Sequence, residues 1–502
     1  MSVHRTFGVL AAGLALGAGA LVPAVIGEIP VADAASPTVV AAGNKPIPIT
    51  RQDRLYVADQ TSNTVTVIDP STNRTLGSIP LGTQRVGAVF SPQYLESVGV
   101  HGLAFSGETH RLAVVSVTSN TVDIVDTTTN KVATRTDVGR ASHEGSFTKD
   151  GKQFWVAARA RDTLTIVDAV RGGVIANLPV GQGPSKVVMS PDGKLAYVNH
   201  ITMPQITVID VASRRIVDRI TGLADAFSSD EAISPDGTEL WASHKRAGKI
   251  SVVDLVHRRV AQVLTTGPDT NHPQFADTPA GKYVYLSVGG LDHTLVYRRD
   301  NGTSRLVKRV QNTGHAPHGV AASGDGSRIY VGLEKSDRID VIDTATMKII
   351  KTIPSGQEPQ AVVYAPSAAP SGQAPNLTRQ GLGQQARSVA TTLPDGRAGQ
   401  RLDPVKGRAL EGTVRPVAGV DMIQLQARGL TPNTTYQAYS VGRNGQRSAL
   451  VTFNTDANGN APMVLAFSSF TGRSIALASR GTAPANATPV NLAYCDCGCG
   501  CC

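Results

Sequence analysis

The chain has 502 residues, of which 41% are hydrophobic and 17% are charged. This length exceeds that of one compact domain, and this composition supplies enough apolar surface for real cores, which excludes a fibrous or a disordered protein. The formal net charge is +9, but no aromatic residues interleave with the basic ones to stack on bases, so we exclude nucleic acid as a partner.

The first 35 residues have the order of a secretory signal peptide. Positive charge in residues 1–5 precedes an Ala/Gly/Leu/Val run from Phe7 to Ile26, and the small residues Ala32-Asp33-Ala34 follow. This order predicts cleavage near Ala34 or Ala35. An uncleaved membrane anchor is the alternative, because the apolar run approaches the ~20 residues that a membrane span needs. No later segment is apolar enough to span, so we expect a secreted or cell-surface protein.

Seven copies of one repeat follow the signal peptide, over residues 36–365. The first copy begins at Arg54 as RLYVADQTSNTVTVIDPSTNRTLGSIPLG. Its V-I-D turn returns at Asp126, Asp168, Asp210, Asp254 and Asp343, with a degenerate copy, LVYRRD, around Arg298. Each unit contains four short apolar runs separated by turns such as Pro191-Asp192-Gly193. Four strands every 42 to 45 residues are typical of propeller blades, which bury their faces only against neighbouring blades. We therefore predict an all-β, seven-bladed β-propeller.

A strand left over at the end of the repeats predicts how the ring closes. The segment PQAVVYAP, starting at Pro359, has the character of an innermost strand but no later unit to join. We expect it to pair with the strand at Leu55, because closure removes the exposed edges of an open array.

The repeats resemble the YVTN family of bacterial β-propellers over about residues 50–365. The resemblance rests on YVAD at Tyr56, YVNH at Tyr197 and the turn S-P-D-G-K at Ser190, together with the V-I-D strand. It implies the propeller fold. It does not imply one activity, because the family includes binding, surface-layer and redox-associated members.

Histidines gather at one position of the repeat. The residues that align just before each innermost strand are His101, His143, Ser185, Asp230, His272, His318 and Gln360, and the second strands end in His200 and His244 on the same face. Imidazole is a common ligand of copper and zinc. We therefore predict a metal site built from His101, His143, His200, His244, His272 and His318, with Glu144, Asp230, Glu231 and Asp269 as further ligands or as supports for the rings. The alternative is that each imidazole bonds to backbone and caps a turn.

An enzyme is a further alternative. A His-lined axis is similar to the copper site of nitrous oxide reductase, although the cysteine-bearing cupredoxin domain of that enzyme has no counterpart here. Propeller lyases and lactonases also carry His and Glu at these positions, which makes His143, Glu144, His272 and His318 the candidate catalytic residues. No segment reproduces a complete catalytic motif, so the sequence leaves open whether the chain is an enzyme.

The opposite face is expected to be basic. The turns after V-I-D carry Arg74, Lys131, Arg171, Arg214, Arg215, Arg258, Arg259, Arg298, Arg299 and Lys348. Such a ring would attract a polyanion, which for an exported protein means a cell-wall polymer or anionic lipid headgroups. A ring that only aids solubility is the alternative.

A second domain follows the repeats. Residues 366–400 are rich in Pro, Ser, Gly and Gln and predict a flexible linker. Alternating segments such as MIQLQARGL and SALVTFNT then predict a small β-sandwich over residues 401–482.

All five cysteines lie in the tail, residues 483–502, as Cys495, Cys497, Cys499, Cys501 and Cys502. Their spacing is similar to that of metallothionein stretches and fits copper(I) or zinc. The alternatives are an oxidised disordered terminus, an intermolecular cross-link or a processing signal.

Three functions remain from the sequence. The first is an exported protein that binds copper or zinc through the histidines, the cysteine tail or both. The second is a cell-surface binding or structural module that engages a wall polymer or a protein partner. The third is a metal-dependent lyase, lactonase or oxidoreductase.

Overall fold

A computed structural model describes residues 47–84, 96–278, 280–300, 303–399, 409–417 and 419–482. The predicted signal peptide and the cysteine tail lie outside these residues. Among the residues that are described, no helix combines the length and the hydrophobicity that crossing a bilayer requires.

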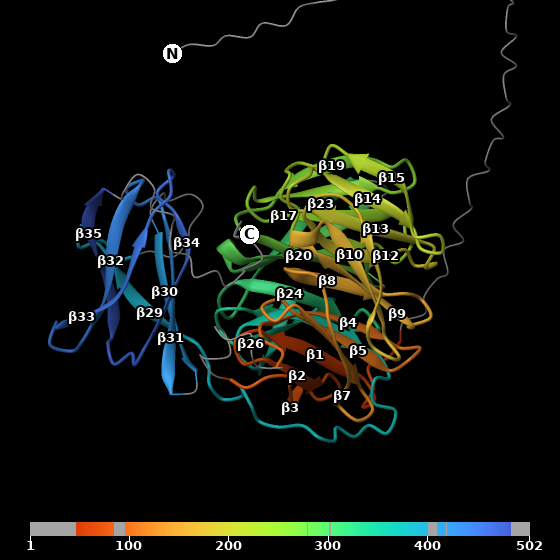
Figure 1. The fold of residues 1–502 in the computed structure, drawn as a ribbon, viewed down its shortest axis with the longest axis horizontal. Helices are drawn as coiled ribbons and strands as arrows, with labels where there is room; N and C mark the ends of the chain where they lie inside the picture. The colour runs from red at the N-terminus through yellow and green to blue at the C-terminus, as the bar shows by residue number, and fades with distance from the viewer. Residues whose placement is uncertain are drawn as a thin grey trace, which may run out of the picture. The chain divides into compact units, whose positions relative to one another are not determined.

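Seven four-stranded antiparallel sheets form the blades of the propeller in this described part (Figure 1). Blade 1 consists of β28 (Pro359–Ala365), β1 (Arg54–Asp59), β2 (Thr64–Asp69) and β3 (Arg74–Pro80). Blade 2 consists of β4 (Val100–Ser106), β5 (Arg111–Ser116), β6 (Thr121–Asp126) and β7 (Lys131–Asp137). Blade 3 consists of β8 (Ser142–Phe147), β9 (Gln153–Ala158), β10 (Thr163–Asp168) and β11 (Val174–Pro179), with the short 3₁₀ helix η1 (Arg159–Arg161) after β9.

The remaining blades repeat this order. Blade 4 consists of β12 (Pro184–Met189), β13 (Leu195–His200), β14 (Gln205–Asp210) and β15 (Arg215–Thr221). Blade 5 consists of β16 (Asp230–Ile233), β17 (Glu239–His244), β18 (Lys249–Asp254) and β19 (Arg259–Thr265). Blade 6 consists of β20 (Thr270–Thr278), β21 (Gly281–Val288), β22 (His293–Asp300) and β23 (Thr303–Gln311), with η2 (Gly289–Leu291) after β21. Blade 7 consists of β24 (Pro317–Ala322), β25 (Arg328–Leu333), β26 (Arg338–Asp343) and β27 (Lys348–Pro354).

Burial explains why the inner and outer strands differ in sequence. The second and third strands of a blade are covered on both faces by neighbouring blades, so nearly all of their residues are buried, as in β2 and β9. The outermost strands β11 and β19 alternate between exposed and half-buried residues. The cores lie between blades: Trp155 of blade 3 packs in one cluster with Val187 of blade 4, and Leu55 of blade 1 with Tyr330 of blade 7.

The predicted closure of the ring is confirmed. Strand β28, the last of the propeller, pairs antiparallel with β1, with Leu55 opposite Tyr364 and Val57 opposite Val362. In Figure 1 the red strands of blade 1 accordingly lie beside the green-blue strands of blade 7. Blade 1 is therefore built from both ends of the repeat region.

The second domain is a further all-β unit with a core of its own. Its strands are β29 (Arg387–Thr392), β30 (Ala409–Val417), β31 (Val420–Arg428), β32 (Thr434–Val441), β33 (Arg447–Asn454), β34 (Ala461–Ser468) and β35 (Ser474–Thr482). Strand β29 joins two halves, because its first residues pair with β30 and its last residues pair with β35. Side chains of both halves, including Ile423, Tyr436 and Ile475, form one buried cluster.

Residues 366–400 differ from the flexible linker that we expected. The backbone of Thr378 exchanges two hydrogen bonds with Ser78 of blade 1, and the Gln380 side chain donates to the carbonyl of Gly82. The end of the segment is strand β29. Hydrogen bonds to blade 1 hold this Pro- and Gln-rich segment in place, together with the few apolar residues Ala368 and Leu377, which pack against a buried cluster of blades 1 and 2. So few apolar residues give no sign of order in the composition.

A buried arginine links the second domain to blade 7. Arg415 of β30 is 0% exposed, and its Nε lies 3.2 Å from Asp337 Oδ1. The same guanidinium also donates to the backbone carbonyl of Glu334 and to Gln424. A buried ion pair whose remaining donors are satisfied makes the position of β30 specific, whereas removal of one partner would leave a buried charge unpaired.

Asp59, at the end of β1, gives a test of the fold through pH. Its carboxylate is 0% exposed and accepts hydrogen bonds from the hydroxyls of Thr64 and Thr66. Burial raises the pKa of Asp59 to about 8, although the two hydroxyls oppose the shift. An unfolded aspartate has a pKa of ~3.9, so the native state holds one more proton between about pH 4 and pH 8. The contribution of this group to the free energy of unfolding therefore falls with rising pH across that window and levels off above it.

We expect Asp59→Asn to remove this slope, because the amide is neutral at every pH. Between pH 5 and pH 8, the free energy of unfolding of the variant minus that of the wild type should rise by at most ~1.4 kcal/mol per pH unit. Denaturant titrations at four pH values measure this difference. Asp300→Asn, which changes an exposed carboxylate, is the control. A constant difference between wild type and Asp59→Asn would contradict the assignment.

Candidate functional site

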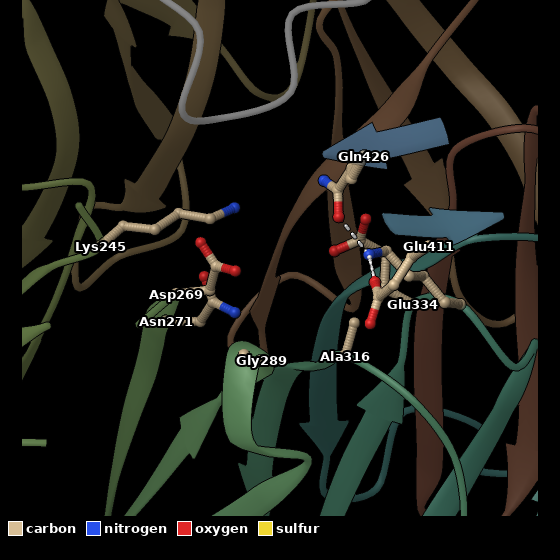
Figure 2. Close-up of a pocket in the computed structure, with 10 residues that line it drawn as sticks. Lys245, Asp269, Asn271, Gly289, Ala316, Glu334, Glu411 and Gln426 are labelled. Carbon is tan, nitrogen blue, oxygen red and sulfur yellow. Dashed lines mark hydrogen bonds and ion pairs between the residues drawn. The ribbon is translucent and has the colours of Figure 1, made fainter. Parts of the chain in front are cut away.

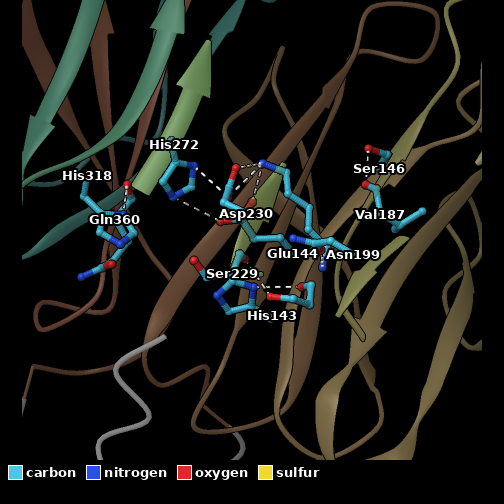
Figure 3. Close-up of polar contacts among 12 residues, drawn as sticks. His143, Glu144, Ser146, Val187, Asn199, Ser229, Asp230, His272, His318 and Gln360 are labelled. Carbon is cyan, nitrogen blue, oxygen red and sulfur yellow. Dashed lines mark hydrogen bonds and ion pairs between the residues drawn. The ribbon is translucent and has the colours of Figure 1, made fainter. Parts of the chain in front are cut away.

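The innermost strands of the seven blades bring one residue each to the propeller axis. These residues are His101 of β4, His143 of β8, Ser185 of β12, Asp230 of β16, His272 of β20, His318 of β24 and Gln360 of β28. All seven are between 0% and 8% exposed. Four of the six histidines that the sequence singled out as metal ligands thus lie in one buried group, part of which is seen in Figure 3.

An irregularity of the strands aims these side chains. In six blades the register between the first and second strands shifts at the axial residue, so that one extra residue is accommodated there. In blade 3, for example, His143 and Glu144 together stand opposite Ala157. Such a β-bulge turns a side chain away from its regular direction. It explains how two consecutive residues both contribute to the axial group.

Glycines let the innermost strands approach each other closely. A Cβ on Gly102 would lie 2.5 Å from the carbonyl oxygen of His143, and a Cβ on Gly319 would lie 2.1 Å from that of Gln360. Both distances are too short for any other residue. The His-Gly dipeptides at His101 and His318 are therefore a sequence signal for the axial position.

His101 and His143 face each other through their Nε2 atoms, which are 3.1 Å apart. The Nδ1 of His143 lies 2.9 Å from the backbone carbonyl of Ser185, and that of His101 lies 2.8 Å from Gln60 Oε1. A carbonyl oxygen only accepts hydrogen bonds, so each Nδ1 carries the proton. The two Nε2 atoms therefore present lone pairs to each other.

The Nδ1 atoms of the neighbouring imidazoles, His318 and His272, also face oxygen atoms. His318 Nδ1 donates to the backbone carbonyl of Gln360, at 3.3 Å, which leaves its Nε2 as the acceptor nitrogen. The His318 ring centroid lies 4.7 Å from that of His272 and 6.2 Å from that of His101. His272 Nδ1 lies 3.0 Å from Asp230 Oδ2.

Glu144 connects two groups of possible ligand atoms. Those of His101, His143 and Glu144 lie within 4.8 Å of one another, and so do those of Glu144, Asp230 and His272. We call them the first and the second triad. Figure 3 shows Glu144 beside Asp230 and His272.

Lys186 lies among the carboxylates of the second triad. Its Nζ is 2.8 Å from Glu144 Oε2 and 3.2 Å from each oxygen of Asp230. Lys186 was not predicted as a site residue, because it follows the axial Ser185 directly and only a bulge brings a next neighbour to the axis.

The buried charges shift the pKa values of the group. Burial lowers the pKa of His143 and of His272 well below its ordinary value, and the charges of Arg159 and Lys186, respectively, lower it further. Both imidazoles are therefore neutral near pH 7, the form that binds metals. Burial alone would raise the pKa of Glu144, but Lys186 and the nearby imidazoles lower it. Burial would lower the pKa of Lys186, but Asp230 and Glu144 raise it, so Lys186 is an ammonium.

Glu231, the residue after the axial Asp230, is 0% exposed, and neither of its carboxylate oxygens has a hydrogen-bond partner of acceptable geometry in the described part of the chain. Burial raises the pKa of Glu231 well above its ordinary value, although Lys186 opposes the shift. The raised pKa favours the protonated, uncharged form of Glu231.

The structure does not bring His200 and His244 into the axial group. His200 bonds to the Gln182 carbonyl and to Thr207 Oγ1, and His244 bonds to Ser251 Oγ, each within or next to its own blade. For His200, the bond to the Gln182 carbonyl is the capping role that stood as the alternative, whereas His244 bonds to a side-chain hydroxyl of its own blade. Asp269 lies away from the axial contacts and pairs with Arg428 of the second domain.

The expected basic face is present in part. Arg74, Lys131, Arg171, Arg215, Arg258, Arg259 and Lys348 are exposed. Arg299 differs, because it is only 6% exposed and pairs with Glu239 and Asp277 while its guanidinium covers the ring of Phe275. It therefore serves packing in blade 6 rather than a basic surface.

A polar pocket lies where loops of the propeller meet β30 and β31. Figure 2 shows Lys245, Asp269 and Asn271 on one side and Glu411 and Gln426 on the other. Its volume of about 30 Å³ holds water rather than an organic substrate. Lys335 fills part of it and pairs with Glu411 at 2.8 Å.

Comparisons with known proteins support the fold. The model of the family described as "Cytochrome D1 heme domain" matches residues 129–324, less than half of the chain. A gluconolactonase of the periplasm from Pseudomonas aeruginosa is 15% identical, covering 62% of this chain and 99% of its own, with a TM-score of 0.50. A protein of unknown function from Desulfotomaculum acetoxidans is 12% identical, covering 62% and 99%, with a TM-score of 0.52. A hydrazine synthase from Kuenenia stuttgartiensis is 22% identical, covering 54% and 90%, with a TM-score of 0.48. No curated protein matches the chain.

The axial residues do not fit the haem that the family description implies. A haem bound by one of these imidazoles needs open space around its iron for the macrocycle. The Nε2 of His143 instead meets the Nε2 of His101 at 3.1 Å, and the surrounding side chains are almost fully buried. The spacing of the donor atoms suits a single ion.

The protonation of His143 and His272 is open to a direct test. In metal-free protein labelled with ¹⁵N-histidine, we expect both rings to stay neutral at pH 5.5, with the proton of His143 on Nδ1, because burial disfavours the imidazolium. Two-bond ¹H–¹⁵N correlation spectra distinguish the two tautomers from the imidazolium. His143→Gln and His272→Gln assign the signals, and the chain in urea provides imidazoles with the ordinary pKa of ~6.5. Imidazolium shifts for either ring at pH 5.5 would refute the predicted neutral state.

Proposed function

We propose that this chain is an exported metal-binding protein that holds a zinc or copper ion on the propeller axis. The ligands are His101 Nε2, His143 Nε2 and a carboxylate oxygen of Glu144. Gln60 and Ser185 orient the two rings from behind through the Nδ1 protons.

One observation carries the proposal, namely the two Nε2 atoms that face each other at 3.1 Å with both Nδ1 atoms already bonded to acceptors. Two lone pairs at this distance repel unless an electrophile lies between them. A proton is disfavoured, because the pKa of His143 is lowered well below its ordinary value by burial. A metal ion meets the requirement, since two nitrogens at 2.0–2.1 Å from a tetrahedral ion lie ~3.3 Å apart.

The surroundings have the form that metal sites take in other proteins. A ligating histidine usually donates its second ring proton to a carbonyl or a carboxylate, which fixes the tautomer and the ring orientation. Two imidazoles and one glutamate are a known zinc set, and copper(II) binds nitrogen-rich sites more tightly than zinc does. The ligands come from the neighbouring strands β4 and β8, so the folded propeller presents them already in place.

We propose binding rather than turnover. The axial residues are between 0% and 8% exposed, which leaves no open face for an organic substrate at His143 or Glu144. The likeness to a gluconolactonase extends to the fold alone at 15% identity. In this proposal the cysteines at 495–502 form a second metal site, whose ligands are thiolates. The exposed basic turns form a surface for an anionic wall polymer.

Metal analysis tests the axial site. The full-length chain with all five cysteines changed to serine separates the axis from the tail. After incubation with zinc and removal of free metal, we expect this protein to retain the axial ion in elemental analysis. His143→Gln in the same background removes a ligand, and its affinity for zinc should fall by at least ~100-fold, since even changes behind the ligands cost ~10–100-fold.

His200→Gln is the matched control, because it removes a buried imidazole of the same propeller that does not lie on the axis. Its zinc affinity should equal that of the parent. The proposal is refuted if the cysteine-free chain retains no metal, or if His143→Gln and His200→Gln lose affinity equally.

A further inference from the structure

The second triad contains a carboxylate oxygen that no hydrogen bond satisfies. Glu144 Oε1 is buried, has no hydrogen-bond partner among the described residues, and lies 3.7 Å from His272 Nε2. Oxygen and nitrogen donors on one tetrahedral ion are ~3.3–3.5 Å apart. Glu144 Oε1 and His272 Nε2, with Asp230 beside them, therefore have the composition and nearly the spacing of a cation site.

The remaining oxygens of that site are already bonded to a cation. Lys186 Nζ contacts Glu144 Oε2 at 2.8 Å and both oxygens of Asp230 at 3.2 Å. Its side chain is 18% exposed, whereas those of Glu144 and Asp230 are 6% and 4% exposed. A buried carboxylate pair needs a positive charge close by, and this ammonium supplies it.

We infer that the second triad is a cation site that the chain fills with the Lys186 ammonium, so that the axis takes one metal ion instead of two. This inference rests on the proposed function, because the single ion is the one assigned to the first triad. Lys186 occupies Glu144 Oε2 and both oxygens of Asp230.

Electrostatics explains the exclusion of a second ion. A metal ion on Asp230 and His272 would lie next to the Lys186 ammonium and to the ion of the first triad. The low dielectric of a buried site makes such like-charge repulsion strong. Lys186 also fixes Glu144, the residue that the triads share, and is therefore a positioning residue for the first ion.

The experiment compares metal stoichiometry in the cysteine-free full-length chain. We expect about one zinc ion per chain for the parent at saturating zinc. Lys186→Gln removes the ammonium and frees three carboxylate oxygens, so it should bind about two. Lys194→Gln, which removes an exposed lysine paired with Asp192 in the same blade, should still bind one, and so should Lys186→Arg, which keeps the positive charge.

Folding of Lys186→Gln is part of the test. Without zinc, its thermal unfolding midpoint should lie below that of the parent, because Asp230 and Glu144 lose their counter-ion. Zinc should restore the midpoint, since the second ion replaces the lost charge. A variant that stays unfolded with zinc present would count against the inference.

The outcomes separate the two proposals. No zinc in the parent overturns the proposed function. Two zinc ions in the parent, or one in folded Lys186→Gln, overturn only the role of Lys186.

Discussion

Pairing of β28 with β1 is the constraint on which the rest of the structure depends. It joins the two ends of the repeat region in one sheet and gives every blade a neighbour on both sides. A closed ring places all seven innermost strands around one axis, so residues at equivalent positions of distant repeats must meet. His101 and His318 are more than two hundred residues apart in sequence, yet their ring centroids are 6.2 Å apart. The candidate site is thus a direct consequence of ring closure.

The axis is polar although the blades around it are packed with apolar side chains. Each axial group has a partner across a blade boundary, such as His143 with Ser185 or Lys186 with Asp230. Buried polar networks of this kind are stable only when their members are satisfied. The Nε2 atoms of His101 and His143 face each other at 3.1 Å, and Glu144 Oε1 has no hydrogen-bond partner among the described residues. These two features are the reason that we propose a binding site at the centre rather than a structural plug.

Much of the fold follows from the sequence, because the V-I-D spacing, the turn signals and the surplus strand at Pro359 reflect local propensities and a repeating burial pattern. The seven-bladed propeller, its closure and the second all-β domain are confirmed. The alignment of the repeats also identified His101, His143, His272 and His318 as one group. The YVTN resemblance stays a resemblance.

Other features depend on three-dimensional details that no repeat pattern contains. The bulges that aim Glu144 and Lys186 at the axis are irregularities of strand pairing. His200 and His244 lie on the expected face, but the hydroxyls of Thr207 and Ser251 turn their rings into the blades. Gln60 was missed because it follows β1 rather than preceding an innermost strand. The order of residues 366–386 arises from backbone hydrogen bonds to blade 1, which composition does not encode.

The most direct measurement of the central claim is anomalous diffraction from crystals of the cysteine-free chain grown with one equivalent of zinc, recorded on both sides of the zinc absorption edge. The account predicts a peak between His101 and His143, ~2.0–2.1 Å from each Nε2 and in contact with Glu144. Zinc found only at surface carboxylates, with the two Nε2 atoms still facing each other and no peak between them, would contradict it.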